Sequence, residues 1–329
     1  MTTVRLRLVG IVLFAVLTPL FGAASPSHAE YPEGGKRITF IVPFSAGGSN
    51  DILSRVIGQK LSEAWHIPVV IENQVGASGA IGTAHAAKSS PDGYTLLILS
   101  STYTINAAVM AQLPYDPATA FAPVTMLGKA PMMLAVSKKV AAQNAKDLIA
   151  LARAKPDTLN FGSAGVGSVN HIAMELLKSL GNLKIEHAPY RTGNAAVNDL
   201  AGGHIDMFVG SLPQMMQLAK SNAATAIAVT SKARAPSVPD VPTIAESGVP
   251  GYELEQWWGL VVPAGTPADV VAKLNGEVRR ILTAPDVVAF LAGEGAEPTP
   301  STPEELGKHI AAELQRWRDL VQSAGLKTQ

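Results

Sequence analysis

The chain has 329 residues, of which 47% are hydrophobic and 16% are charged, and it contains no cysteine. Its length suits a folded protein of about two domains, and its apolar content excludes intrinsic disorder. The 26 basic residues equal the 26 acidic ones, so nothing indicates a nucleic-acid partner, and the missing cysteines exclude disulfides, thiolate metal sites and lipid attachment at cysteine.

The first 29 residues have the pattern of a secretory signal peptide. Arg5 and Arg7 precede a charge-free apolar run at 8–17, and the small residues Ser27 and Ala29 suit a signal peptidase. A membrane anchor is the alternative, but the run is shorter than the roughly 20 residues that a spanning helix needs. We therefore expect cleavage after Ala29 and a soluble protein in the bacterial periplasm. The mature chain is then slightly acidic, because the leader contains two arginines and no acids.

Strand and helix patterns alternate along the body of the chain. The predicted segments are, in order, strand 37–43, turn 45–49, a helix over 52–61, strand 68–73, helix 79–87, strand 94–99, and a second unit that runs from strand 132–136 to strand 226–229. Alternation at this spacing predicts a parallel, doubly wound α/β sheet.

The last predicted segments are a long connection, one more strand and two helices. A proline-rich stretch at 235–250 predicts a long extended connection, and 258–262 has the pattern of a strand. Two helices are predicted to follow, one starting at 266–267 and one at a capping box formed by Thr302 and Glu305.

Two glycine-rich turns, at 43–51 and 160–168, carry the candidate chemistry. Each joins a predicted strand to a predicted helix. Glycine lets backbone N–H groups face a guest, and a helix start adds unpaired donors and a positive dipole end. Such a turn suits a carboxylate, which gains roughly 1.5–3 kcal/mol per charge-assisted hydrogen bond. In a doubly wound sheet these turns lie at the carboxyl ends of strands, where ligands usually bind.

Two other interpretations of the turns remain open. Gly162 and Gly167 have the spacing of a phosphate-binding loop, but Ser168 stands where that loop needs lysine. The glycines could also serve only to make tight turns. Two turns of the same design, one in each predicted unit, favour a shared binding role.

Catalytic constellations are hard to find in this sequence. It has no G-x-S-x-G or H-E-x-x-H motif and no closely spaced pair of histidine ligands, so we expect neither a metal nor a cofactor. His171 could face a ligand or bond locally at its helix start. Arg191 could clamp a carboxylate or be solvated, and Asp206 could anchor backbone at the cleft or be a solvated strand-end acid. Asp51 is expected to complement the helix dipole.

A series of short motifs resembles one known family. The motifs are Val42-Pro43-Phe44-x-x-Gly47-Gly48-x-x-Asp51, Glu72-Asn73-x-x-Gly76-Ala77-x-Gly79-x-Ile81-Gly82, Pro91-Asp92-Gly93-Tyr94-Thr95-Leu96-Leu97, Gly162-Ser163-Ala164-Gly165-x-Gly167-Ser168, Pro189-Tyr190-Arg191, Asp199-Leu200-x-Gly202-Gly203, Ala228-Val229-Thr230-Ser231, Pro239-Asp240-Val241-Pro242-Thr243, Pro250-Gly251-Tyr252-Glu253 and Pro263-Ala264-Gly265-Thr266-Pro267. Together they resemble the Bug/TctC-type solute-binding receptors of tripartite tricarboxylate transporters, over essentially the whole mature chain. Arg191 departs from the family pattern, in which lysine is common.

The resemblance implies a type II periplasmic binding protein, with two doubly wound α/β lobes, a two-crossover hinge and a ligand cleft between the lobes. Lobe 1 would comprise 31–131 and 253–329, and lobe 2 would comprise 132–252. In the family, the first turn and its counterpart in lobe 2 hold one carboxylate, and the matching residues here are Phe44, Ser45, Ala46, Gly47, Gly48, Ser163, Ala164, Gly165, Gly167 and Ser168. Candidates for the distal end of the ligand are Ser78, Gly79, Ser100, Thr102 and Arg191, and His171 and Asp206 complete the candidate set.

We therefore expect a receptor without enzymatic activity. It would capture a dicarboxylate, tricarboxylate or aromatic acid and deliver it to the membrane permease subunits of a tripartite tricarboxylate transporter, as a monomer without a cofactor. Two alternatives remain: an exported α/β hydrolase or isomerase that uses His171 and a nearby acid, and a ligand-sensing partner of a sensor kinase.

Overall fold

The computed structural model describes residues 31–293 and 295–323, so the expected signal peptide, 1–29, lies outside the described residues. The strands are β1 (Ile38–Val42), β2 (Val69–Asn73), β3 (Thr95–Ser100), β4 (Phe121–Ser137), β5 (Asn160–Ser163), β6 (Glu186–Pro189), β7 (Met207–Ser211), β8 (Ala224–Val229), β9 (Glu255–Pro263) and β10 (Glu297–Pro298). The helices are α1 (Ser49–Trp65), the short η1 (Ala77–Gly79), α2 (Ala80–Ala87), α3 (Ser101–Val109), α4 (Ala145–Ala154), α5 (Val169–Gly181), α6 (Gly193–Gly202), α7 (Leu212–Lys220), α8 (Ala268–Leu282), α9 (Pro285–Gly293) and α10 (Pro303–Ser323). Within these described ranges, no helix combines the length and the apolar character needed to cross a membrane.

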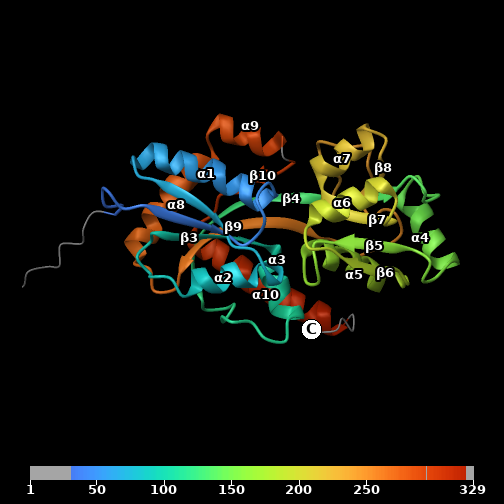
Figure 1. The fold of residues 1–329 in the computed structure, drawn as a ribbon, viewed down its shortest axis with the longest axis horizontal. Coiled ribbons are helices and arrows are strands. Elements are labelled where there is room, and N and C mark those ends of the chain that lie inside the picture. Colours follow the sequence, from blue (N-terminus) through green and yellow to red (C-terminus); the bar gives the residue numbers. More distant parts are fainter. Residues whose placement is uncertain (1–30, 294, 324–329) are drawn as a thin grey trace, which may run out of the picture.

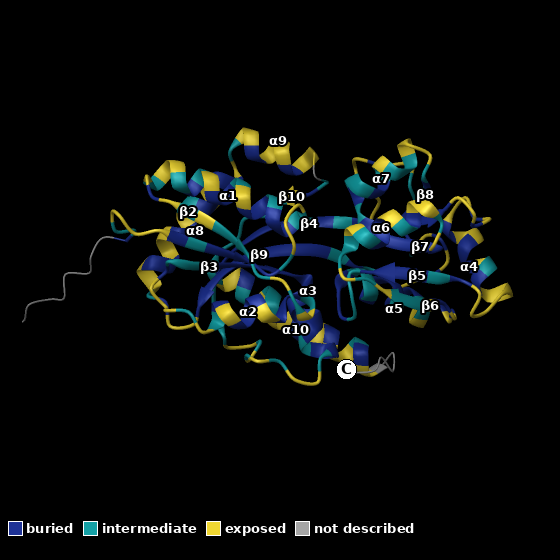
Figure 2. Ribbon diagram, viewed as in Figure 1, coloured by how far each residue is buried: buried dark blue, intermediate teal, exposed yellow. Residues whose placement is uncertain are grey.

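Two α/β lobes lie side by side and share the long strand β4 (Figure 1). In lobe 1 the strand order is β2-β1-β3-β9-β4, and it continues through lobe 2 as β4-β7-β5-β6, with β8 and β10 also paired to β4. Helices cover both faces of the sheet, so that its central strands are buried while the outer helix faces and the edge strands β2 and β6 are more exposed (Figure 2). In lobe 1, α1, α8 and α9 pack on one face and α2, α3 and α10 lie on the other (Figure 1).

The predicted parallel pairing holds within each lobe, but the strands that join the lobes run the other way. β1 is parallel to β2 and β3, and β5 is parallel to β6 and β7. In contrast, β9 is antiparallel to β3 and β4, and β4 is antiparallel to β7 and β8. A buried strand has the same apolar pattern in either direction, so the sequence does not reveal this difference. Helix α9, between the two predicted C-terminal helices, was also not predicted.

Strand β4 changes its partners between Pro131 and Met132. Up to Pro131 it pairs with β9, and from Met132 onward it pairs with β7 and β8. The chain returns from β8 to β9 beside this point, where the N–H of Leu254 donates to the carbonyl of Thr230 at 2.9 Å. We propose that the two lobes divide at these adjacent crossings, which places 31–131 and 253–329 in lobe 1 and 132–252 in lobe 2.

Thr230 ties the two crossings together. This residue is fully buried, and its Oγ1 accepts the N–H of Met132 at 2.8 Å. The N–H of Thr230 donates in turn to the carbonyl of Met132 at 2.9 Å. One side chain therefore satisfies a backbone donor that is buried away from water at the point where the lobes meet.

The last helix, α10, packs along α3 and β4 and contributes to two core clusters. Near its start, Leu306 belongs to a lobe 1 core cluster with Trp257 of β9. Near its end, Trp317 belongs to a cluster built mostly from lobe 2 residues. The buried Glu313 lies between them and accepts the indole N–H of Trp257 at 3.4 Å and that of Trp317 at 2.9 Å. The helix therefore spans the junction of the lobes.

Replacing Thr230 tests the role of its hydroxyl at the hinge. Thr230→Val should lower the free energy of unfolding by about 1–3 kcal/mol, because the buried N–H of Met132 loses its acceptor. Thr230→Ser keeps the hydroxyl and should cost clearly less. Urea denaturation followed by circular dichroism measures both, and equal losses for the two variants would show that the hydroxyl is not the source of the stabilisation.

Candidate functional site

The first glycine turn, residues 43–48, connects β1 to α1 and is held from behind by Asp51. The Oδ2 atom of this buried carboxylate accepts the N–H of Gly47 and the Nε–H of Arg55, both at 2.9 Å. Its Oδ1 atom accepts a hydrogen bond from Asn73 at 2.9 Å. Both carboxylate oxygens of Asp51 are therefore used in hydrogen bonds that stabilise the first turn.

Asn73, the last residue of β2, fixes the other end of the same turn. Its Nδ2 donates to the carbonyl of Phe44 at 3.0 Å. Burial alone would raise the pKa of Asp51, but hydrogen bonds from Arg55, Gly47 and Asn73 outweigh it and hold that pKa below its ordinary value. The carboxylate thus stays ionised, and its charge is balanced locally.

The second glycine turn, residues 163–168, connects β5 to α5 and is held by its own hydroxyl groups. Ser168 is the N-cap of α5: its Oγ accepts the N–H of His171 at 3.4 Å and donates to the carbonyl of Gly165 at 2.6 Å. The hydroxyl of Ser163 accepts the N–H of Gly165 at 3.1 Å. Several of the donors that the sequence suggested for a ligand are therefore used inside the turn.

The same arrangement fixes one glycine in each turn. Gly47 and Gly167 have φ values of 80° and 78°, a left-handed conformation that glycine adopts without strain. The N–H of Gly167 donates to Nδ1 of His171 at 3.2 Å, just as that of Gly47 donates to Asp51. In both lobes the acceptor is four residues further on, in the first turn of the next helix. His171 thus bonds locally, which is one of the two roles considered for it.

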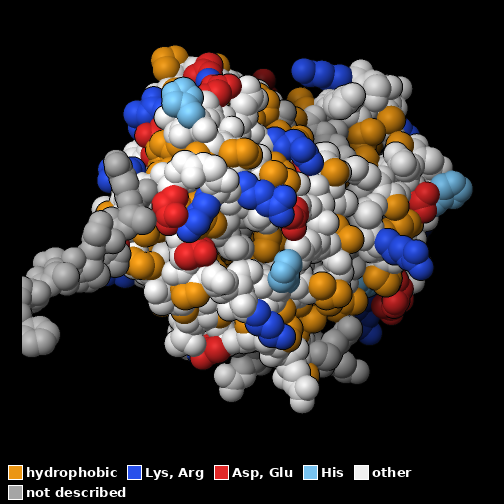
Figure 3. Space-filling model, turned by 60° about the vertical axis from the view of Figure 1, so that its left-hand side comes forward, with side chains coloured by type: hydrophobic (Ala, Val, Ile, Leu, Met, Phe, Trp, Pro, Cys, Tyr) orange, Lys and Arg blue, Asp and Glu red, His pale blue; other side chains and the backbone are white. Residues whose placement is uncertain are grey.

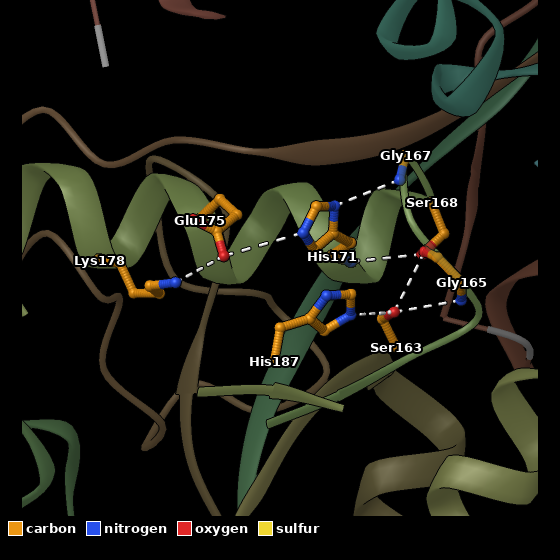
Figure 4. A network of polar contacts seen from close by, with 8 residues as sticks. All are labelled: Ser163, Gly165, Gly167, Ser168, His171, Glu175, Lys178 and His187. Atoms are coloured by element: carbon orange, nitrogen blue, oxygen red, sulfur yellow. Dashed lines mark hydrogen bonds and ion pairs between the residues drawn. The ribbon is translucent and has the colours of Figure 1, made fainter. Parts of the chain in front are cut away.

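His171 is part of an aromatic stack behind the second turn (Figure 4). Its ring lies 4.2 Å from that of His187 between centroids, and the ring of Phe161 lies 4.7 Å from His187. Nε2 of His187 is 2.7 Å from the hydroxyl of Ser163. Because burial disfavours the charged ring, it lowers the pKa of both histidines to about 4, with a smaller contribution to His171 from Lys178.

The loop from Gly76 to Gly79, in lobe 1, is hydrogen-bonded to lobe 2. All four of its residues have positive φ, including the non-glycine residues Ala77 at 44° and Ser78 at 50°. The hydroxyl of Ser78 donates to the carbonyl of Val166, in the second turn, at 2.7 Å. An L-residue in this conformation carries roughly 1–2 kcal/mol of strain, so the loop holds Ser78 in an unusual position at the junction.

The first turn, this loop and helix α3 line a small pocket, and the second turn lies beside it at Asn106. Its lining residues are Pro43, Phe44, Ser78, Gly79, Thr83, Ile98, Leu99, Ser100, Tyr103 and Asn106. A methyl group on Gly79 would lie 3.1 Å from the ring of Phe44, and one on Gly167 would lie 3.0 Å from Oδ1 of Asn106. The structure therefore brings the first turn, the Ser78 loop and the second turn to one place.

Of the other candidate residues, some lie at this pocket and some do not. Ser100 lines it, and Thr102 is buried in the first turn of α3. Arg191 is exposed between β6 and α6. Asp206 accepts the N–H of Asn160, the first residue of β5, at 2.8 Å. It therefore lies at the end of β5 opposite the second turn, and the structure does not bring it into the pocket.

Sequence reasoning missed Asn73, Thr83 and Asn106. Asn73 was part of a recognised motif, but nothing local connects it to the first turn 29 residues earlier. The others lie on helices that turn toward the pocket only in the folded chain. Over the described part of the chain, no group of three or more His, Asp or Glu side chains forms a metal site. On the face shown in Figure 3, basic and acidic side chains are interspersed.

Comparison with known proteins gives matches over both lobes. The sequence matches the tripartite tricarboxylate transporter family receptor, TctC, over residues 53–326. Protein BugT of Bordetella pertussis is 34% identical over 324 residues, which cover 98% of each chain. A solved structure from R. palustris with adipate is 35% identical with a TM-score of 0.85, covering 90% of this chain and 99% of that one. MatC from Rhodopseudomonas palustris with bound malate is 30% identical with a TM-score of 0.81, covering 88% and 99%.

Alanine at Gly167 tests how tightly the second turn is packed. Gly167→Ala combines a left-handed backbone with contacts of 3.0 Å to Asn106 and 3.1 Å to Val109, so it should lower the free energy of unfolding by about 2–3 kcal/mol. Gly47→Ala has the same backbone conformation but open space around the added carbon, and should cost only about 1 kcal/mol. Gly276→Ala, in the interior of α8, should be neutral or stabilising. Chemical denaturation measures all three, and equal effects at positions 47 and 167 would contradict the packing argument.

The histidine stack predicts a loss of stability in acid. An unfolded histidine takes up a proton near pH 6.5, whereas folded His171 and His187, with pKa values of about 4, remain neutral. The unfolded chain then binds more protons, so the free energy of unfolding should fall as the pH decreases from 6.5 toward 4, by on the order of 1–3 kcal/mol. His187→Phe keeps a ring in the stack and should make this dependence shallower. Unfolding curves between pH 7.5 and 4.5 provide the measurement, and an unchanged slope in the variant would refute the prediction.

Proposed function

This chain belongs to the tripartite tricarboxylate transporter receptor family of periplasmic solute-binding proteins, and on that basis we propose that its own ligand is a small organic carboxylate. The ligand is a dicarboxylate, a tricarboxylate or an aromatic acid. Two structurally similar relatives have been solved with adipate and with malate, both dicarboxylates, which supports this class.

The observation that carries the proposal is that the Ser78 loop lies beside both glycine turns: Gly79 lies against Phe44 of the first, and the hydroxyl of Ser78 donates to the carbonyl of Val166 in the second. The turns precede α1 and α5, so two helix N-termini, each with unpaired N–H groups and a positive dipole end, lie at one junction. In this proposal residues 44–48 and 163–168 hold one carboxylate of the ligand. Ser78, Gly79, Ser100 and the surrounding pocket contact the rest of it.

Closure of the lobes is the step that completes this site. The hydrogen bond from Ser78 to Val166 joins lobe 1 to lobe 2 and forms only when the second turn approaches the loop. A ligand held by donors from both lobes stabilises the closed form by its differential affinity. A micromolar dissociation constant corresponds to about −8 kcal/mol, which a few charge-assisted bonds and apolar burial supply.

We further propose that the receptor is a periplasmic monomer that delivers its ligand to the permease subunits of a tripartite tricarboxylate transporter. The family match supports the transporter, and the leader pattern of residues 1–29 supports export. The closed, liganded form is the one that the permease would recognise, because closure changes the relative position of the two lobe surfaces.

The environment of Ser163 and His187, beside the second turn, also favours a receptor over a hydrolase. Ser163 lies 2.7 Å from His187, a separation typical of a nucleophile and its base. However, Ser163 is fully buried and its hydroxyl is engaged by the N–H of Gly165. A substrate has no access to this hydroxyl, so we assign the pair to the support of the turn.

Calorimetric titration of the mature protein with adipate, malate, citrate and benzoate tests the proposal. At least one should bind stoichiometrically, without turnover. Gly47→Val places a β-branched residue in a left-handed conformation, and Ser168→Ala removes the cap of α5, so each should weaken binding by at least about tenfold.

Two outcomes would contradict this proposal. Binding at wild-type affinity by both folded variants would show that the turns do not hold the carboxylate. Conversion of any of these compounds, or of their esters, by the purified protein would indicate an enzyme. Circular dichroism of each variant confirms that it is folded before the titration.

A further inference from the structure

Two apolar side chains of lobe 1, Val75 and Ile81, face water beside the contact between the lobes. Val75 is 56% exposed and Ile81 is 58% exposed, whereas the other exposed large apolar side chains of the described residues range from 37 to 42%. Ile81 folds back over Gly76, the residue after Val75: a methyl group on Gly76 would lie 2.5 Å from Cδ1 of Ile81. The two side chains therefore lie close together, and an exposed apolar patch of this kind marks an interaction surface.

The backbone between these two residues is fixed and reaches lobe 2. All four residues from 76 to 79 have positive φ, and the N–H of Gly79 donates to the carbonyl of Gly76 at 2.9 Å. From the middle of this loop, the hydroxyl of Ser78 donates to the carbonyl of Val166 in lobe 2 at 2.7 Å. The patch is therefore held in one position relative to lobe 2 while this hydrogen bond is formed.

Lobe 2 places a positive charge close to the same contact. A methyl group on Gly165 would lie 3.6 Å from the carbonyl of Tyr190 and 3.8 Å from the hydroxyl of Ser78, so these two residues approach Gly165 together. Arg191 follows Tyr190 and is exposed. Among the described residues, its guanidinium forms no hydrogen bond or ion pair. The closed form thus presents apolar side chains from lobe 1 and an unpaired cation from lobe 2 at one contact.

We propose that Val75, Ile81 and Arg191 form the docking surface for the permease. This inference rests on the proposed receptor function and specifies where the permease contacts the receptor. The occupant is a periplasmic loop of the permease, with apolar side chains that cover Val75 and Ile81 and an acidic side chain that pairs with Arg191. Opening of the lobes separates Ser78 from Val166 and moves Arg191 away from the apolar pair. The complete surface therefore exists only in the closed form, which lets the permease distinguish a loaded receptor from an empty one.

The composition of the docking surface favours a permease loop over two other occupants. In a symmetric dimer the surface would face its own copy and would bring two unpaired arginines together, because none of its three residues is acidic. A lipid surface is held electrostatically by clusters of basic residues, and the docking surface has a single one. An apolar loop with one acidic residue matches both parts of the surface.

Aspartate at either apolar position tests the docking surface. Ile81→Asp and Val75→Asp place a negative charge against the apolar loop, so each should reduce uptake of a labelled carboxylate into vesicles that contain the permease subunits by at least about tenfold. The carboxylate is whichever of adipate, malate, citrate and benzoate binds in calorimetry. Its dissociation constant should change by less than about twofold, because neither side chain belongs to the proposed ligand site.

Val288→Asp is the matched control. Val288 is also an exposed valine of lobe 1, but it lies on α9, which covers the other face of the sheet. The same change in charge at this position should leave uptake at the wild-type rate. A loss of uptake equal to that of Val75→Asp would show that added charge acts in general, and would overturn the docking surface.

Crosslinking tests the dependence on closure. Ile81→p-benzoylphenylalanine should crosslink on illumination to a permease subunit, at least about threefold more with saturating carboxylate than without it. Val288→p-benzoylphenylalanine should give no such product. Arg191→Glu should reduce the crosslink from position 81 at saturating carboxylate, since it repels the acidic side chain of the loop.

The outcomes separate this inference from the proposed function. If both aspartate variants bind the carboxylate and support normal uptake, the docking surface is wrong while the receptor function stands. Crosslinks between two receptor molecules, or binding to vesicles without permease that Ile81→Asp abolishes, would assign the surface to another occupant and overturn the inference. If no acid in the panel binds to the wild-type protein, the proposed function fails and this inference fails with it. Circular dichroism establishes that each variant is folded, as expected for side chains that are more than half exposed.

Discussion

The candidate site depends on one hydrogen bond that occurs in both lobes: a left-handed glycine donates its N–H to a side chain four residues later. This bond sets the direction of each turn before any ligand arrives, because it fixes the glycine against the first turn of the following helix. Asp51 and His171 supply the acceptors. One is an anion balanced by Arg55, and the other is a neutral ring in an aromatic stack. The same geometry is thus stabilised by different chemistry on the two sides of the cleft.

The proposed binding of a carboxylate cannot depend on the net charge of the protein. The chain has no net charge to concentrate carboxylates, and the acid nearest the first turn, Asp51, would repel one if its charge were free. Its hydrogen bonds from Arg55, Gly47 and Asn73 use that charge locally. In the proposed function, the attraction for a carboxylate therefore comes from oriented backbone groups and helix starts, which act over short distances.

Local sequence patterns predicted many of the helices, strands and turns, but none of the contacts between residues far apart in the chain. The strand–turn–helix units around both glycine turns were predicted, and the capping box of Thr302 and Glu305 is confirmed by reciprocal hydrogen bonds of 2.8 and 3.2 Å. Each of these depends on neighbours within a few residues. The bond from Ser78 to Val166 spans 88 residues. Asn106 was not among the predicted site residues, and only the folded chain places it beside the second turn.

Helix α10 links the two main core regions of the molecule. Leu306, near its start, belongs to the lobe 1 cluster around Trp257, and Trp317, near its end, belongs to a cluster that combines α3 with residues of lobe 2. Any movement of lobe 2 relative to α10 has to change the packing of that second cluster. The burial of Trp317 therefore makes the positions of the C-terminal helix and of lobe 2 dependent on each other.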